Sequence, residues 1–345
     1  MPGSVNTRGL VLALGAGGVA AGVAWQRRHL RAIRQDPALA ELRRSRGGRG
    51  TEIRSADGTR LHAETFNEGG SGPLVVLLHG WTEQLSIWGP VIDHLTQAGL
   101  PVLAYDLRGH GRSAQATADD YSLPRFGEDL EAVLASITPE GREVVVVGHS
   151  LGAMAIAAWA QDHRVADRIQ AAALVNTGLV DLLTGHLLFG EMASRFNSRL
   201  AGRVFMGVSA PLPALSSPIA HTLIRHAAFG PSADRAQIAF YERMLLDTPP
   251  KVRGACGDAM ADMDLLDATE RLEVPTLVVA GDRDRLTPPA QARRIAERLP
   301  QSAGLIEFDH TGHMSLLERP RELADAVLGL IRSLPSTSAE AALSK

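Results

Sequence analysis

Residues 143–160 read Glu-Val-Val-Val-Val-Gly-His-Ser-Leu-Gly-Ala-Met-Ala-Ile-Ala-Ala-Trp-Ala. The valine run is typical of a buried strand and the small-residue run of a packed helix, so the stretch predicts a strand, a sharp turn and a helix. Ser150 is expected in a strained conformation at the turn, with its hydroxyl exposed at the carboxyl edge of a sheet. Gly148 and Gly152 are expected where any Cβ would collide with the neighbouring strand and helix.

A glycine-x-serine-x-glycine match is weak on its own in a chain with 34 glycines,. A nucleophilic serine also needs a base and a carboxylate that orients the base. Both types of residue occur downstream of Ser150. An apolar run at 274–280 predicts a buried strand that ends in a loop with Asp284, and a short strand at 303–308 precedes the loop with His313,. The carboxyl ends of these strands should deliver all three side chains to one sheet edge.

In these features the chain resembles the α/β-hydrolase superfamily, specifically its lid-bearing serine branch of esterases, lipases, C–C bond hydrolases and cofactor-free haloperoxidase-like enzymes. The resemblance covers about residues 51–333 and includes two further motifs,. Residues 74–81 look like the third strand and oxyanion loop of the family, and residues 106–113 look like the turn after its fourth strand. The resemblance implies a mostly parallel central sheet flanked by helices, with a helical lid inserted after the sixth strand.

The resemblance also implies a role for each site residue. Ser150 would be the nucleophile, Asp284 the acid and His313 the base. The backbone N–H groups of Trp81 and Leu151 would form the oxyanion hole. Residues expected to support these motifs are His79, Gly80, Gly148, His149 and Gly152.

Other residues compete for two of these roles. His310 competes with His313, but the glycine before His313 matches the Gly-His pattern of the family,. Asp282 competes with Asp284, and Asp181 lies just past the sixth predicted strand, where some similar enzymes place the acid. His79, His110 and His149 lie in motif turns, where they are expected to orient loops by hydrogen bonding.

The chain divides into five predicted parts, starting with an apolar segment and basic linker (1–50). The first part of the hydrolase core (51–180) opens with a hairpin that turns at Asp57-Gly58, and its second part covers 271–335, before a tail (336–345). Between them, residues 181–270 are too many for a loop and predict a helical lid. The apolar faces of that lid either pack only against the protein or line an acyl-chain pocket above Ser150.

The N-terminus contains an uncharged run from Gly9 to Trp25, 17 residues long, followed by many arginines. The positive charge behind the run favours an uncleaved membrane anchor with the catalytic domain on the cytoplasmic side. The alternatives are a cleaved signal with export, or a soluble cytoplasmic protein. Residues 11–20 also match a dinucleotide-binding fingerprint, but the region around Asp36 is rich in arginine where a second apolar strand should end,.

Composition excludes several other classes. The net charge of −3 gives no reason to expect nucleic acid binding,. The single cysteine excludes an internal disulfide framework and a cysteine-rich metal site,. His310, His313 and Asp309 lack a further ligand at suitable spacing, so we expect no metal and no other cofactor,.

A serine nucleophile suits acyl transfer, whereas similar epoxide hydrolases and haloalkane dehalogenases use an aspartate at this position. The sequence therefore predicts a carboxylic-ester hydrolase for hydrophobic substrates of small to medium size. C–C bond hydrolysis, perhydrolysis and transfer to another acceptor remain open on the same triad. A non-catalytic, membrane-tethered binding protein on the same fold is the alternative from another class.

Overall fold

The computed structural model describes residues 7–137, 143–180, 216–261 and 263–335. Within these residues, eight strands form one sheet in the order β1-β2-β4-β3-β5-β6-β7-β8. Strand β2 runs antiparallel to both of its neighbours, and all pairs from β4 to β8 are parallel. The strands are β1 (Arg49–Arg54), β2 (Arg60–Phe66), β3 (Leu74–Leu78), β4 (Val102–Tyr105), β5 (Val144–His149), β6 (Ala171–Val175), β7 (Thr276–Gly281) and β8 (Ser302–Phe308).

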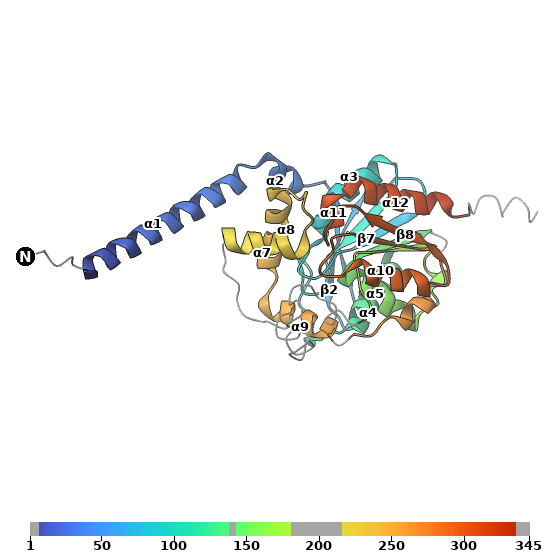
Figure 1. The fold of residues 1–345 in the computed structure, drawn as a ribbon. Helices are drawn as coiled ribbons and strands as arrows, with labels where there is room; N and C mark the ends of the chain where they lie inside the picture. Colours follow the sequence, from blue (N-terminus) through green and yellow to red (C-terminus); the bar gives the residue numbers. More distant parts are fainter. Residues whose placement is uncertain (1–6, 138–142, 181–215, 262, 336–345) are drawn as a thin grey trace, which may run out of the picture.

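Helices cover both faces of this sheet (Figure 1). One face carries α3 (Gly89–Gln97), α11 (Ser315–Glu318) and α12 (Pro320–Ser333). The other carries α4 (Leu123–Ile137), α5 (Leu151–Asp162) and α10 (Pro289–Arg298). Short 3-10 helices are η1 (Leu85–Trp88), η2 (Val165–Asp167) and η4 (Asp267–Arg271).

The central strands are apolar throughout because both of their faces are buried. Along β3, Val75 and Leu77 pack into the cluster that contains α3 and α12, whereas Val76 and Leu78 pack into the cluster that contains α4 and α5. This alternation follows from the two-residue period of a strand. The predicted mostly parallel sheet with flanking helices is therefore confirmed, and the predicted hairpin is present as β1 and β2 with Gly58 at φ +83°.

Helices also follow β6, in the part of the chain predicted to form a lid. They are α7 (Pro218–Ala228), α8 (Arg235–Asp247) and α9 (Pro250–Ala261). In α8, Ile238, Phe240 and Met244 are buried in the same cluster as α3 and α12, whereas Leu223 of α7 is 65% exposed. Residues 181–215 of the predicted lid, including Asp181, lie outside the described residues. The lid and the domain boundaries therefore stay predictions.

Residues 35–50, in the predicted basic linker, contain regular structure and pack against the core. They contain α2 (Pro37–Leu42), which begins with Asp36 accepting a hydrogen bond from the backbone N–H of Ala38. Leu39 of α2 is 3% exposed and belongs to the same hydrophobic cluster as α8. Arg46 forms an ion pair with Asp93 of α3 at 3.0 Å. Burial and pairing thus hold this segment against the core.

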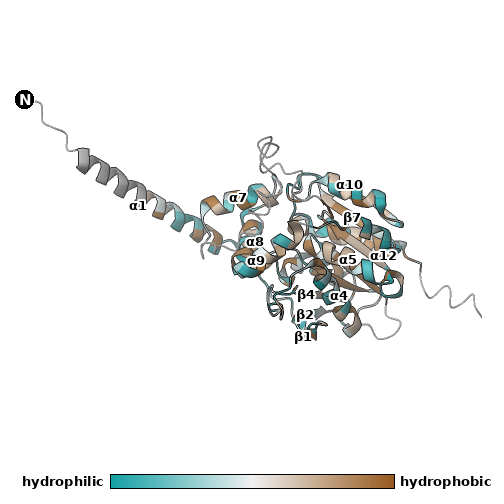
Figure 2. Cartoon of the chain, turned by 90° about the horizontal axis from the view of Figure 1, so that it is seen from below, coloured by the Kyte–Doolittle hydropathy of each residue, from teal (hydrophilic) through white to brown (hydrophobic). Residues whose placement is uncertain are grey.

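The predicted N-terminal membrane anchor is wrong. The run from Gly9 to Trp25 belongs to α1 (Thr7–Arg34), whose N-terminal part extends away from the rest of the molecule (Figure 1). Among the described residues, no helix is both long enough and apolar enough to cross a bilayer. The run is shorter than the roughly 20 apolar residues of a typical span. After Trp25 the helix continues into charged residues. The part of α1 that lies next to α7 is accordingly largely hydrophilic (Figure 2).

We expect Leu39→Ala to lower the free energy of unfolding by about 2–5 kcal/mol, because it leaves a cavity between α2 and the core. Chemical denaturation of the full chain measures this change. Val23→Ala is the control, since Val23 of α1 is 47% exposed, and it should change stability by no more than about 0.5 kcal/mol,. Equal stability of the two variants would contradict a structural role for α2.

Candidate active site

Ser150 lies in the sharp turn between β5 and α5. Its backbone has φ +49° and ψ −114°, which is a strained conformation for any residue other than glycine,. A Cβ on Gly152 would lie 2.4 Å from the carbonyl oxygen of Leu78, and a Cβ on Gly148 would lie 2.5 Å from the backbone nitrogen of Ala153. Both contacts are with backbone, so glycine is required at both positions.

The turn is held by backbone hydrogen bonds and leaves the serine side chain available. The N–H of Ser150 donates to the carbonyl of Val175 at 2.9 Å, which ties the turn to the end of β6. The Ser150 carbonyl accepts from Thr177 Oγ1 and from the first turn of α5. The hydroxyl of Ser150 does not cap α5, although Ser150 occupies the N-cap position.

His313 and Asp284 come together at the same sheet edge. Asp284 follows β7, His313 follows β8, and His313 Nδ1 lies 2.9 Å from Asp284 Oδ2. A carboxylate can only accept a hydrogen bond, so Nδ1 of His313 carries a proton and donates it to Asp284,. Both side chains are buried.

The Asp284 carboxylate is saturated with hydrogen-bond donors. Oδ1 accepts from the backbone N–H groups of Leu286 and Thr287, and Oδ2 accepts from Thr287 Oγ1 and Asn176 Nδ2 as well as from His313. Burial alone would raise the pKa of Asp284, but the charge of His313 and these hydrogen bonds outweigh burial and lower it,. Asp284 is thereby kept ionised beside the imidazole.

The competing residues lie elsewhere. His310 is exposed at φ +54°. Asp282 accepts from the Thr311 N–H at 3.1 Å and pairs with Arg283, so its carboxylate serves the loop after β8. Asp181 is outside the described residues. Of the residues considered for acid and base, the structure therefore brings together His313 and Asp284.

The loop after β3 contains Gly80 and Trp81, and it is held in place from both sides. Thr82 has φ +61°, which is unusual for a β-branched residue,. Its N–H donates to His110 Nε2 at 3.2 Å, and its hydroxyl donates to the Trp81 carbonyl and lies 3.1 Å from the Tyr241 hydroxyl of α8. Trp81 Nε1 donates to the Arg253 carbonyl of α9. The helices after β6 therefore contact the loop that carries the expected oxyanion donor.

The hydrogen bonds of two histidines in the motif turns, His79 and His110, require a neutral ring. His79 Nδ1 donates to the Gly80 carbonyl and its Nε2 accepts from the Leu107 N–H. His110 Nδ1 donates to the Arg108 carbonyl and its Nε2 accepts from Thr82. Burial accordingly lowers the pKa of His79 to about 3 and that of His110 to about 4,. These contacts fit the expectation that both histidines orient loops.

Sequence reasoning missed two polar residues of the site. Asn176 follows β6 at φ +45° and donates to Asp284 and to the carbonyl of Gly312. Glu83 is buried in the loop after β3, where it accepts from the Gly80 N–H at 2.6 Å and contacts His149. The one signal in the sequence was that Asn176 directly follows an apolar strand and Glu83 lies in the loop after another, at the edge where Ser150 was expected.

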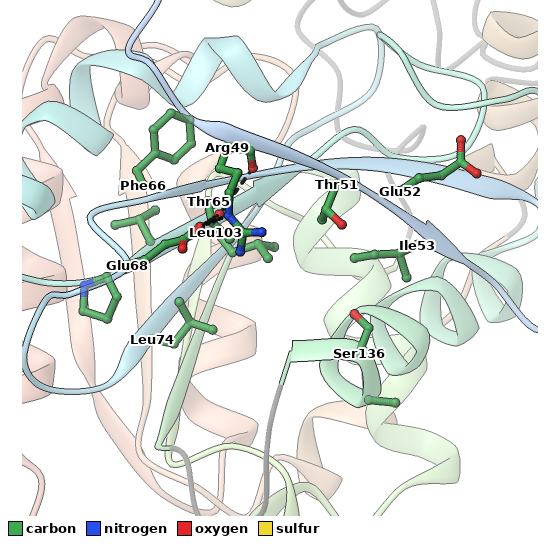
Figure 3. A pocket seen from close by; sticks show the side chains of 13 residues that line it. Arg49, Thr51, Glu52, Ile53, Thr65, Phe66, Glu68, Leu74, Leu103 and Ser136 are labelled. Carbon is green, nitrogen blue, oxygen red and sulfur yellow. Dashed lines mark hydrogen bonds and ion pairs between the residues drawn. The ribbon is translucent and has the colours of Figure 1, made fainter.

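A surface hollow of about 820 Å³ lies at the opposite end of the strands (Figure 3). It is lined by the β1–β2 hairpin and by the start of β3 and β4, and Arg49 and Glu68 pair across it. Because β3 begins here and Gly80 follows its other end, this hollow is remote from Ser150. Among the described residues, no group of three or more His, Cys, Asp or Glu side chains is arranged to hold a metal ion.

Comparison with known proteins identifies the family. The model of the alpha/beta hydrolase fold family matches residues 73–320. A non-heme haloperoxidase of Rhodococcus erythropolis is 28% identical over 76% of this chain and 92% of its own length. A pimeloyl-[acyl-carrier protein] methyl ester esterase of Chromobacterium violaceum is 29% identical over 77% of this chain and 96% of its own length.

A solved esterase structure from a Rhodococcus species superposes with a TM-score of 0.64 at 25% identity, covering 83% of this chain and 99% of that chain. The similar proteins thus include both esterases and haloperoxidases, and they match over nearly their whole length. This chain belongs to the alpha/beta hydrolase fold family and is an enzyme of that class.

Proposed function

We propose that the chain is a serine hydrolase that cleaves carboxylic esters of hydrophobic, small to medium substrates through an acyl-enzyme on Ser150. The observation that carries the proposal is the placement of a strained serine turn and a buried His313–Asp284 pair at one sheet edge. Similar proteins that are named as esterases support the choice of ester hydrolysis.

In the proposed reaction, Ser150 Oγ attacks the ester carbonyl carbon and His313 Nε2 takes its proton. Asp284 stabilises the resulting imidazolium, and the N–H groups of Trp81 and Leu151 stabilise the negative oxygen of the tetrahedral intermediate. His313 then protonates the leaving alcohol, and an acyl-enzyme remains. Attack by water, activated by the same imidazole, releases the acid and restores Ser150.

The preference for apolar substrates is supported by the composition of the helices after β6. Phe229 and Tyr241 are buried beside the site loops, and Tyr241 contacts Thr82 next to Trp81. Ligand sites are lined mostly by apolar and aromatic side chains with few polar groups. A lid of this kind above Ser150 would accept an acyl chain and exclude water.

A perhydrolase or haloperoxidase-like reaction is a second candidate, because one of the similar proteins is named as a non-heme haloperoxidase. The same acyl-enzyme would form, and hydrogen peroxide would replace water as the attacking nucleophile. The product would then be a peracid. C–C bond hydrolysis and transfer to another acceptor also remain compatible with the same three residues.

We expect a fluorophosphonate probe to label Ser150, because it lies in a strained turn at the sheet edge that also carries the His313–Asp284 pair. Ser150→Ala should abolish labelling and lower ester hydrolysis by at least about 10³-fold while the protein stays folded. Mass spectrometry locates the label and circular dichroism checks the fold. Equal turnover by the variant would refute the serine-hydrolase proposal.

His313→Ala should reduce kcat nearly as strongly as Ser150→Ala, and Asp284→Asn should reduce it by about 10³- to 10⁴-fold, because the asparagine stabilises the wrong imidazole tautomer. The matched controls are His310→Ala and Asp282→Asn, which change the two competing residues and leave the His313–Asp284 hydrogen bond in place. Steady-state kinetics on one ester compares the four variants. If a control variant lost more activity than its partner, the assignment of acid or base would be wrong.

A panel of 4-nitrophenyl esters with acyl chains of increasing length, assayed with and without hydrogen peroxide, separates the first candidate from the second. We expect hydrolysis of short and medium esters with little peracid, because water is the abundant nucleophile. Peracid formed faster than free acid at millimolar peroxide would favour the perhydrolase. Ser150→Ala should lose both products, since both arise from one acyl-enzyme.

A further inference from the structure

Glu83 is a buried carboxylate in the loop that follows β3. It is 1% exposed, and it belongs to neither the expected triad nor the expected oxyanion hole. Its Oε2 accepts from the backbone N–H of Gly80 at 2.6 Å, directly before Trp81. A buried charge is costly unless it is paired and hydrogen-bonded. The partner that offsets this cost is His149, the residue before Ser150.

His149 donates from both of its ring nitrogens. Nδ1 lies 3.0 Å from Glu83 Oε1 and 3.1 Å from Oε2, and Nε2 lies 2.9 Å from the backbone carbonyl oxygen of His313. Carboxylates and carbonyls only accept hydrogen bonds, so both ring nitrogens must carry protons. His149 is therefore an imidazolium, and the Glu83–His149 pair is a buried ion pair.

The electrostatics of the two groups agree with this geometry. Burial alone would lower the pKa of His149, but the charge and hydrogen bond of Glu83 outweigh burial and raise it. Burial alone would raise the pKa of Glu83, but the charge and hydrogen bond of His149 outweigh burial and lower it,. Each residue thus keeps the other ionised in the interior.

The pair also explains why residue 80 is a glycine. A Cβ on Gly80 would lie 2.9 Å from His149 Nδ1 and 3.0 Å from the Glu83 carboxyl carbon. The pair therefore packs directly against the backbone of the loop after β3. The ring of His149 also lies close to that of His313, with 4.9 Å between the ring centres.

We propose that Glu83 is a positioning residue, which acts through His149 to fix the positions of three loops of the site relative to one another. The Glu83 carboxylate holds the N–H of Gly80, and it holds His149 next to Ser150. His149 in turn holds the backbone of His313. This inference rests on the proposed function, because it assigns Glu83 to the same serine-hydrolase reaction.

The effect of losing this pair should fall on kcat. Glu83 contacts no expected substrate-binding group, so substrate affinity does not depend on it. The three loops carry the nucleophile, the base and one oxyanion donor, and a displacement of about 1 Å between such groups can cost about 10²-fold in rate. Transition-state stabilisation is therefore lost, and ground-state binding is kept.

Glu83→Gln is the main test, because glutamine keeps the size of the side chain and an acceptor for Gly80 but removes the charge. We expect kcat to fall about 10- to 100-fold with KM within about twofold of the wild type. Glu83→Asp, which keeps the charge on a shorter side chain, should recover part of the loss. His149→Gln should cost as much as Glu83→Gln, and the double variant should lose no more than either single variant.

Glu131→Gln is the matched control. Glu131 of α4 accepts from Trp159 Nε1 at 2.9 Å and from Arg168 at 2.8 Å, and it lies 3.7 Å from His163 Nε2. It is therefore also a glutamate beside a histidine, but it is remote from Ser150. We expect its kcat to stay within about twofold of the wild type. An equal loss of kcat in Glu131→Gln and Glu83→Gln would overturn the proposal.

A spectroscopic measurement tests the ion pair without any activity assay. In the full-length wild type, nitrogen-15 NMR should show both ring nitrogens of His149 protonated at neutral pH, and Glu83→Gln should convert the ring to a neutral form. A neutral His149 in the wild type overturns the proposal even if the variants fail to fold. Failure of the proposed function is recognised separately, as a folded wild type with no hydrolysis that depends on Ser150.

Discussion

The rest of the site depends on one close approach between two backbones. The first turn of α5 lies directly against the end of β3, where a Cβ on Gly152 would meet the carbonyl oxygens of Leu78 and His79 at 2.4 and 2.7 Å. This approach places Ser150 beside the loop after β3. This close approach is possible only because residue 152 has no side chain. It also requires the strained, positive-φ backbone of Ser150,.

Two carboxylate–imidazole pairs surround this contact, one between Asp284 and His313 and one between Glu83 and His149. Their environments differ in a way that matters for chemistry. Asp284 contacts the imidazole of His313 through one ring nitrogen, Nδ1, whereas both ring nitrogens of His149 lie within hydrogen-bond distance of oxygen acceptors,. The same two residue types thus make one pair that we propose for proton transfer and one pair that we propose to hold backbone in place.

Most strands could be predicted from the sequence, because strands buried on both faces of a parallel sheet are continuous apolar runs. The ends of those runs also located the sheet edge where Ser150, Asp284 and His313 were expected. The partners Glu83 and Asn176 could not be predicted, because their contacts join segments 66 and 108 residues apart in the chain. Helix α2 was missed because its six residues are too few for a helical period, and the roles of the site residues stay predictions,.

The contacts between α1 and the helices after β6 affect the order in which the chain folds during synthesis. Gln26 and His29 of α1 both contact Ser216, and the first of these contacts spans 190 residues. The ring of His29 also packs edge-on against that of His221 in α7. Domains emerge from the ribosome with the N-terminus first. Helix α1 is therefore made before the helices that follow β6, yet it can form these contacts only after the ribosome has released those helices.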